Sequence, residues 1–309
     1  MNMKKIIYTT LFCLGIGHVM AQQEVMVSQY MFNGLFINPA YAGSHQYWSS
    51  SLLHRSQWVN LEGAPTTQLL AIDGPIMDDK MGLGFTLIND QIGVSRDLEF
   101  AGNYAYHLQV GQKSRLSFGI KAGLSAYSAK LTDLNYWDQN DQVFQNDINN
   151  QVVGKFGAGV YWYSERAFAG LSIPTIYAAD DKLSTQIESA TEEYFTQHYY
   201  LNAGYVFKIS KTIDLKPSVL VKYLPNAPVQ ADINCNALFR NTFWLGVSYR
   251  TGDAVIAMVE YQVIPKLRIG YAYDATTSKL NNYSSGSHEI MLGFDFGRDL
   301  AKIKSPRYF

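Results

Sequence analysis

The sequence predicts an all-β fold, a transmembrane antiparallel β-barrel of about 14 strands and of the outer-membrane type. Three observations lead to this prediction: an export signal at the N-terminus, runs in which apolar and polar residues alternate, and connections that are alternately short and long. The composition agrees, because only 17% of the 309 residues are charged while 14% are aromatic, against about 25% charged residues in an average soluble domain. Basic and acidic side chains nearly cancel, at 25 against 26, so no basic surface for nucleic acid is expected.

Residues 1–21 have the features of a secretory signal peptide. Two lysines precede an apolar stretch at 6–19, and small residues occupy the positions before a cleavage site at Ala21. The apolar stretch is shorter than the ~20 residues of a membrane-spanning helix, which argues against the alternative of an N-terminal anchor. Cleavage leaves Cys235 as the one cysteine of the mature chain, so no disulfide bond can form within it.

Residues 22–45 precede the first predicted strand and form a separate segment, either periplasmic or a plug. The apolar residues here do not alternate, and in free solution they would form an exposed patch of the kind that marks an interaction site. Asn38-Pro39 predicts a turn, because the residue before a proline avoids the helical conformation. We expect the segment to enter the periplasmic mouth of the barrel or to dock on a periplasmic partner; alternatively, it only completes the first strand. The candidate interaction residues are Tyr30, Met31, Phe32, Leu35, Phe36, Ile37, Asn38, Pro39 and Tyr41.

Residues 46–297 are expected to form the barrel. From Arg115 to Tyr127 every second residue is apolar and the others are polar or small, which is the period of a strand between two different solvents. The same alternation recurs in Thr242–Arg250 and Lys266–Asp274. In a membrane such strands must close into a barrel, because lipid offers unpaired backbone groups no partner. The predicted strands are 46–59, 66–74, 81–90, 96–109, 114–128, 152–163, 166–176, 196–208, 212–223, 229–240, 242–250, 253–263, 266–274 and 287–297.

The lengths of the connections predict which end of the barrel lies outside the cell. If the chain starts in the periplasm, every even-numbered connection is short, and the three longest, 129–151, 177–195 and 275–286, are odd-numbered. Outer-membrane barrels have short periplasmic turns and longer extracellular loops, whereas a soluble sandwich would not sort its connections in this way. The three long loops are therefore expected outside, and residues 298–309 are expected to form a periplasmic tail.

The polar face of the predicted strands carries charges of both signs, which would point into the lumen. The first interpretation is a lattice of salt bridges that stiffens the barrel; the alternative is a polar interior that holds a segment of a partner or of the chain itself. The candidate lumen charges are Arg115, Lys121, Asp214, Lys216, Lys222, Asp232, Arg250, Lys266, Arg268, Asp274 and Glu289, and Asp97, Glu99, Lys155, Glu260 and Asp295 share their face.

No motif for enzymatic chemistry occurs in the sequence. It has no G-x-S-x-G, no H-E-x-x-H, no Walker loop and no complete G-x-G-x-x-G, so we expect neither catalysis nor a cofactor. The histidines and Cys235 are not spaced as zinc ligands. The stretch Asp133–Asp141 could offer oxygen ligands to Ca²⁺, but it lacks the order and the glycine of an EF-hand loop, and a solvated outer loop is the simpler interpretation.

Several short motifs occur in a characteristic order along the mature chain. The longest is SQYMFNGLFINPAYAG at 28–43. The others are Gln57–Val59, Gly63–Thr66, Gly82–Phe85, Asn103–Tyr106, Leu116–Gly123, Leu215–Ser218, Trp244–Arg250, Leu267–Tyr271, Ser285–Leu292 and Ser305–Phe309. Together they resemble the PorP/SprF family, membrane proteins of the type IX secretion and gliding systems of Bacteroidetes.

The resemblance implies an outer-membrane barrel without catalytic activity. Such a protein supports the secretion or surface anchoring of a specific type IX cargo, for example a large adhesin carrying a C-terminal secretion domain. Its implied partners are outer-membrane lipid, that cargo and, for some members, periplasmic ring or motor components of the system. The alternative function, from a different class, is a general diffusion porin or channel of the outer membrane.

Overall fold

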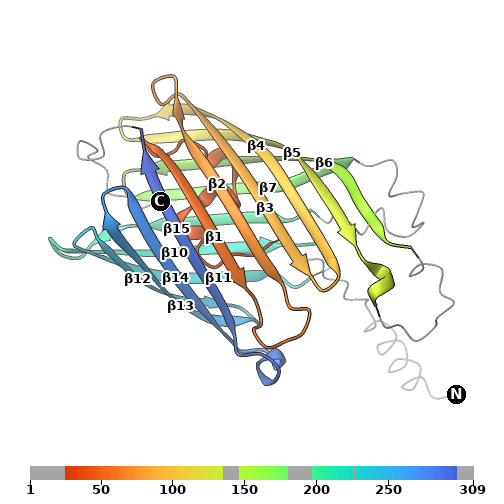
Figure 1. Ribbon diagram of the computed structural model, residues 1–309. Helices are drawn as coiled ribbons and strands as arrows, with labels where there is room; N and C mark the ends of the chain where they lie inside the picture. Colours follow the sequence, from red (N-terminus) through yellow and green to blue (C-terminus); the bar gives the residue numbers. More distant parts are fainter. Residues whose placement is uncertain (1–24, 135–145, 180–196, 226, 298–309) are drawn as a thin grey trace, which may run out of the picture.

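The structure, a computed structural model, describes residues 25–134, 146–179, 197–225 and 227–297 (Figure 1). The predicted signal peptide, the predicted tail, most of the loop 177–195 and the middle of the loop 129–151 lie outside these residues. Within the described ranges, no helix has both the length and the apolar character needed to cross a membrane.

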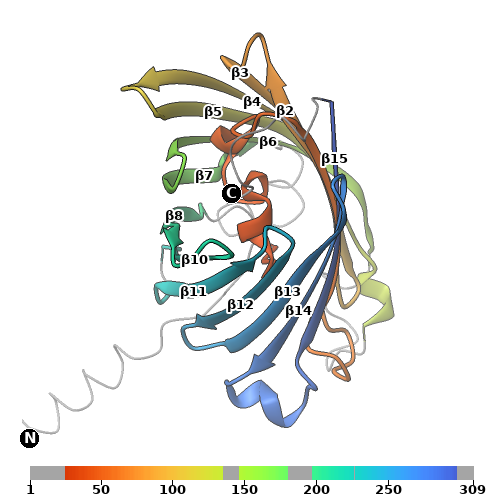
Figure 2. The same cartoon turned by 90° about the vertical axis from the view of Figure 1, so that its left-hand side faces the viewer.

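The described residues form a closed antiparallel barrel (Figures 1 and 2). The strands are β1 (Trp48–Ser56), β2 (Thr66–Ile76), β3 (Met81–Ile92), β4 (Ser95–Val110), β5 (Ser114–Ala129), β6 (Ile148–Ser164), β7 (Ala167–Ala179), β8 (Tyr199–Tyr205), β9 (Phe207–Lys208), β10 (Ile213–Tyr223), β11 (Gln230–Phe239), β12 (Phe243–Arg250), β13 (Ala254–Ile264), β14 (Leu267–Thr276) and β15 (Ser287–Phe296). Since β8 and β9 both pair with β10, they form one strand that is interrupted at Val206, and the barrel has 14 strands. Pairing of β1 with β15 closes it, and the predicted fold class is confirmed.

The alternation predicted for β5 is present in the structure. Phe118, Ile120 and Leu124 are exposed on the outside, while Ser117 and Ser125 are buried inside. Lipid on one side and a polar interior on the other account for this pattern, and among the described residues the ladder closes on itself, as strands in a membrane must.

The two ends of the barrel differ in their connections. The end that carries the connections β5–β6, β7–β8 and β14–β15 is called the long-loop end here, and the opposite end, with turns such as 165–166 and 240–242, the short-turn end. At the long-loop end, a short 3-10 helix, η4 (Leu131–Asp133), follows β5, and another, η6 (Lys279–Asn282), precedes β15.

Residues 25–43, called the lumen segment, lie inside the ring of strands (Figure 2, red). They form three single-turn 3-10 helices, η1 (Tyr30–Phe32), η2 (Gly34–Phe36) and η3 (Pro39–Tyr41). The side chains of Asn33 and Asn38 cap the second and third turns by accepting hydrogen bonds from Leu35 N and Ala40 N. The lumen segment and the inward faces of the strands together form the buried apolar core.

Candidate functional site

The lumen segment passes along the inside of the barrel from one end to the other. Ser28 and Gln29 contact Glu289, the third residue of β15, which lies near the long-loop end. Gly43 contacts Asp73 in the part of β2 that leads to the short-turn end. Between these points the segment runs first beside β10–β12 and then crosses to β5–β7.

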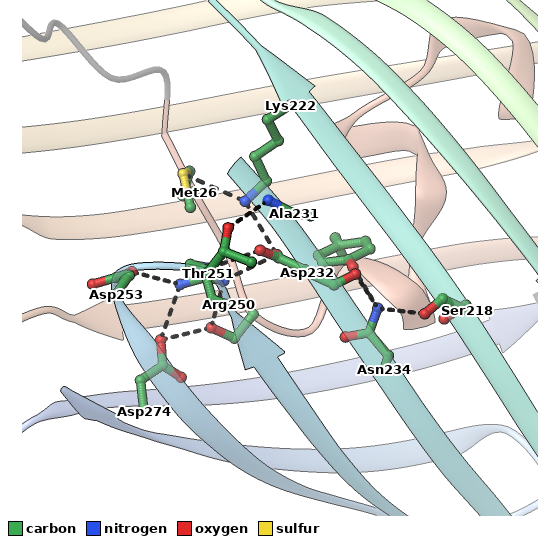
Figure 3. Close-up of polar contacts among 12 residues, drawn as sticks. Met26, Ser218, Lys222, Ala231, Asp232, Asn234, Arg250, Thr251, Asp253 and Asp274 are labelled. Carbon is green, nitrogen blue, oxygen red and sulfur yellow. Dashed lines mark hydrogen bonds and ion pairs between the residues drawn. The ribbon is translucent and has the colours of Figure 1, made fainter. Parts of the chain in front are cut away.

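An ionic cluster at the long-loop end holds the beginning of the segment (Figure 3). The carboxylate of Asp232 accepts a hydrogen bond from Arg250 Nε at 3.2 Å and another from Lys222 Nζ at 3.1 Å. Asp274 Oδ2 accepts a hydrogen bond from Arg55 Nη2 at 2.7 Å and also lies 3.5 Å from Arg250 Nη1. These residues, with Glu289 at 3.2 Å from Arg55, are called the latch cluster. All are almost fully buried, so each charge depends on its partners for compensation.

The latch cluster binds the main chain of the lumen segment directly. The two oxygens of Glu289 accept hydrogen bonds from Ser28 N and Gln29 N, both at 2.8 Å. Ser28 Oγ donates to Asp274 at 2.8 Å and accepts from Arg55 Nη1 at 3.1 Å. An ionised carboxylate that spans two successive amide groups makes strong charge-assisted hydrogen bonds, and here it satisfies buried donors that strand pairing cannot reach.

The middle of the segment packs against β10–β12. Asn234 donates to the hydroxyl of Tyr30 at 2.8 Å. Lys216 Nζ donates to the carbonyl oxygen of Met31 at 3.1 Å. The same ammonium group lies 5.9 Å from the ring centre of Phe32 and 5.1 Å from that of Trp244, which is within the range of a cation–π interaction.

The end of the segment contacts the strands in the short-turn half of the barrel. Asn38 Nδ2 donates to the carbonyl oxygen of Val160 at 3.0 Å. The carbonyl oxygen of Ala42 lies 3.0 Å from His107 Nε2, and Gly43 N donates to Asp73 at 2.9 Å. Polar groups of the strands therefore satisfy main-chain groups of the segment along its whole course.

Glycines in the wall let the main chain of the segment approach closely. A Cβ atom on Gly82 would collide with the carbonyl group of Ala42, and one on Gly119 with the main chain at Ala40. The absence of side chains at these two positions lets the third 3-10 turn and Ala42, the residue that follows it, lie directly against β3 and β5.

The structure brings most of the predicted site residues together. In the lumen segment, Tyr30, Met31, Phe32, Leu35, Ile37, Asn38, Pro39 and Tyr41 are buried, and Phe36 is half-buried. Of the predicted lumen charges, Lys222, Asp232, Arg250, Asp274 and Glu289 belong to the latch cluster. Arg268 pairs with Glu260 and Asp295, and both Lys121 and Lys155 pair with Glu99.

Three further predicted charges lie at or near the short-turn end of the barrel. Asp214 is buried, and Arg115 donates to the carbonyl oxygen of Asp79 near the short-turn end. The prediction that Lys266 points into the lumen is wrong, because Lys266 is exposed in the turn between β13 and β14. The predicted strand 266–274 starts one residue before β14, and its alternation, continued to Lys266, gives this residue the inner face.

Sequence reasoning missed Arg55 as a lumen charge, although Arg55 joins two carboxylates of the latch cluster. The signal was weak because Leu53, on the same inward face of β1, is apolar and fully buried. Ser28 and His107 were also missed as site residues, since their contacts lie 246 and 65 residues away along the chain.

The described residues contain no group of three or more His, Cys, Asp or Glu side chains arranged to hold a metal ion. The candidate calcium stretch Asp133–Asp141 lies largely outside these residues. The contacts described above are ion pairs and hydrogen bonds to a peptide segment.

Comparisons with known proteins identify a family and a set of similar folds. The sequence profile of a family described as "Type IX secretion system membrane protein PorP/SprF" matches residues 19–294. No curated protein gives a significant match.

Three solved structures illustrate the similarity of fold. Omp33 of Acinetobacter baumannii has 8% identity and a TM-score of 0.47, with 81% of this chain and 99% of that chain covered. The toluene transporter TbuX of Ralstonia pickettii has 9% identity and a TM-score of 0.48, with coverages of 85% and 92%. The monoaromatic hydrocarbon channel CymD has 10% identity and a TM-score of 0.49, with coverages of 85% and 91%. At this level of similarity they say nothing about what this chain binds.

Proposed function

This chain belongs to the PorP/SprF family of type IX secretion system membrane proteins, and from that premise we propose that it is a non-enzymatic accessory of the system that serves one specific cargo. It acts in the outer membrane, where a closed barrel with an apolar outer face belongs. Its role is to support the secretion or the surface anchoring of that cargo, of which a large adhesin with a C-terminal secretion domain is the expected kind.

The occupied lumen is the observation that carries this proposal. A general diffusion porin, the alternative function, needs a continuous aqueous path through the barrel. Here Tyr30, Leu35 and Tyr41 of the lumen segment are buried inside the barrel, and hydrogen bonds fix the segment at both ends. The occupied lumen favours a protein that works through its end surfaces over one that works through an open pore.

The long-loop end offers a fixed surface for the cargo. The connection between β1 and β2 is fastened to that between β14 and β15, because Val59 N donates to Gly286 O and Ser285 N donates to Val59 O, both at 2.8 Å. Beside this junction Tyr283 is 70% exposed. An exposed aromatic side chain on a fixed loop is a typical anchor of a protein interface. Periplasmic ring or motor components would meet the short-turn end instead.

Deletion of the gene tests the proposal. Surface and secreted proteins of the deletion strain and of its parent are compared by mass spectrometry. We expect one cargo protein, or a few, to be missing from the surface while other type IX cargo stays at its normal level. Complementation with the wild-type gene should restore the missing protein, and complementation with the Tyr283→Ala variant should restore it less well. An unchanged surface proteome in the deletion strain contradicts the proposal.

A conductance measurement tests the alternative. The purified protein is reconstituted into planar lipid bilayers, and we expect no steady conductance from the wild type. A stable ohmic conductance of porin size, together with slow growth of the deletion strain on a small solute, would support the diffusion porin instead.

A further inference from the structure

The direction of the lumen segment indicates at which end of the barrel the mature chain starts. The first described residues, Val25 and Met26, lie at the long-loop end, where Met26 Sδ is 3.5 Å from Lys222 Nζ. The end of the segment, Gly43, lies at the opposite end, beside Asp73. The segment therefore enters the lumen from the long-loop end, although β1, which follows it, starts at the short-turn end.

Every latch-cluster residue that fixes this start lies near a strand terminus at the long-loop end. Arg55 is the second-last residue of β1 and Arg250 is the last of β12. Asp274 is followed by only two more residues of β14, and Glu289 is the third residue of β15. Side chains from four strands therefore hold Ser28 in place. Ser28 forms hydrogen bonds with Glu289, Asp274 and Arg55 at 2.8–3.1 Å and with Arg250 at 3.4 Å.

We propose that the latch cluster is a binding site for the N-terminal peptide of the mature chain, and that it displays the mature N-terminus at the long-loop mouth of the barrel. That this mouth faces the cell surface rests on the orientation expected from the loop lengths, on which the proposed function also depends.

The reach of the chain supports the proposal. The cleavage that the signal-peptide pattern predicts after Ala21 leaves residues 22–24 before Val25. Three extended residues span at most about 11 Å. The strand path from Arg55 back to Trp48, at the short-turn end, covers seven residues, or about 23 Å at 3.3 Å per residue. A strand tilt of roughly 40° reduces this to a height of about 18 Å. The mature N-terminus is thus too short to return to the other mouth.

Cysteine labelling tests the placement of the N-terminus. In a Cys235→Ala background, one variant carries a Gly-Ser-Cys-Gly-Ser insertion between Gln23 and Glu24. The controls are Tyr283→Cys at the long-loop end and Lys266→Cys at the short-turn end, both at exposed positions. Intact cells are treated with a bulky maleimide that cannot cross the outer membrane, and permeabilised cells are treated in the same way.

We expect the inserted cysteine to be labelled in intact cells as completely as Tyr283→Cys, while Lys266→Cys is labelled only after permeabilisation. Labelling of the insertion together with Lys266→Cys, or failure to label it in both preparations, overturns the placement. If Tyr283→Cys and Lys266→Cys exchange their behaviour, the expected orientation of the barrel is wrong. In that case the inserted cysteine should still be labelled in the same preparations as Tyr283→Cys. A wrong orientation can therefore be distinguished from a wrong placement of the N-terminus.

A second experiment tests the binding site itself. Glu289→Gln keeps the shape of the side chain but removes the charge that two amide groups share. Asp253→Asn is the matched control, because Asp253 pairs with Arg250 at 3.4 Å at the partly exposed rim of the cluster, and no hydrogen bond to Ser28 or Gln29 is found for it among the described residues. The readout is the rate of chymotrypsin cleavage at Tyr30 and Phe32 in the folded, detergent-solubilised protein.

We expect Glu289→Gln to accelerate this cleavage by at least tenfold and Asp253→Asn to leave it unchanged. Electrophoresis without heating checks that the Glu289→Gln barrel remains folded. A folded Glu289→Gln protein that is cleaved at the wild-type rate overturns the assignment of the binding site, whichever end of the barrel faces outside.

Discussion

At the scale of single residues, the lumen segment depends on atoms that are missing from the wall. Gly82 and Gly119 stand where a side chain would overlap the main chain of the lumen segment, at Ala42 and Ala40 respectively. Both glycines belong to strands that the sequence predicts, 81–90 and 114–128. The sequence does not reveal that these glycines face another part of the same chain, because alternation identifies the face of a strand and not what covers that face.

Gly119→Ala should therefore loosen the segment. Adding a methyl group to a packed interface costs about 1–3 kcal/mol, and the new Cβ would press on the main chain of Ala40 rather than on a side chain that can rotate away. We expect faster chymotrypsin cleavage at Tyr30 and intermittent conductance in bilayers. Gly102→Ala is the control, because its nearest neighbour would be the carbonyl oxygen of Ala122 at 3.9 Å. Equal behaviour of both variants would show that close packing against Gly119 does not hold the segment.

The buried charges of the latch cluster should be costly to separate. Arg250→Met leaves Asp232 without its guanidinium partner in a buried site, and breaking a buried pair costs about 3–5 kcal/mol. We expect a large fall in the urea midpoint of unfolding in liposomes. Adding Asp232→Asn together with Lys222→Met should restore part of it, because neither the carboxylate nor its ammonium partner is then left unpaired. Lys113→Met, which removes the exposed pair with Glu165, is the control and should leave the midpoint unchanged.

At the scale of elements, alternation predicted the strands because each has lipid on one side and the lumen on the other. It could not predict the interruption between β8 and β9, because Tyr205, Val206 and Phe207 keep the alternation, with the outer two exposed and Val206 buried. The register with β10 is the same on both sides of the interruption and places Pro217 opposite Tyr205. Since proline has no N–H group to donate, the ladder is interrupted there.

The register of β15 leads to a test of insertion into the membrane. Leu292 lies in the middle of this strand and is exposed on the lipid side. Leu292→Arg should cost about 2–4 kcal/mol, the effect of arginine near the bilayer midplane. We expect little heat-modifiable protein in the outer membrane. Ile264→Arg, also exposed but at the last residue of β13, should assemble almost normally, since the cost falls to about 0–1 kcal/mol near the interface. Equal assembly of both variants would contradict the depth assigned to Leu292.

The lumen segment was only partly predictable as an element. Asn38-Pro39 predicted a turn, and the structure has a 3-10 turn that starts at Pro39 with the side chain of Asn38 as its cap. Its binding partners could not be identified from the sequence, because they lie on distant strands and are reached only when the barrel closes. Local residue patterns contain no information about such contacts.

At the scale of the whole molecule, the segment and the barrel can be separated by experiment. Deletion of residues 28–43 with the signal peptide retained removes the contents of the lumen while the strand ladder keeps its pairing partners. If the segment acts as a plug, the deleted protein should conduct ions in bilayers where the wild type does not. If it acts by docking on a periplasmic protein, conductance should stay unchanged and co-purification of that protein should be lost. If conductance, co-purification and cargo secretion all stay as in the wild type, the segment acts neither as a plug nor by docking.

The position of the latch cluster also has a consequence for the order of assembly. Ser28 and Gln29 bind side chains that lie 246 to 261 residues further along the chain, and contacts of such high contact order form late in folding. Arg55 and Glu289 are also neighbours across the seam where the first and last strands meet. A chain that lacks its last two strands can neither close the seam nor seat its own N-terminus. Seating of the segment thus marks a completed barrel, and an incomplete one keeps a loose apolar peptide that periplasmic proteases can recognise.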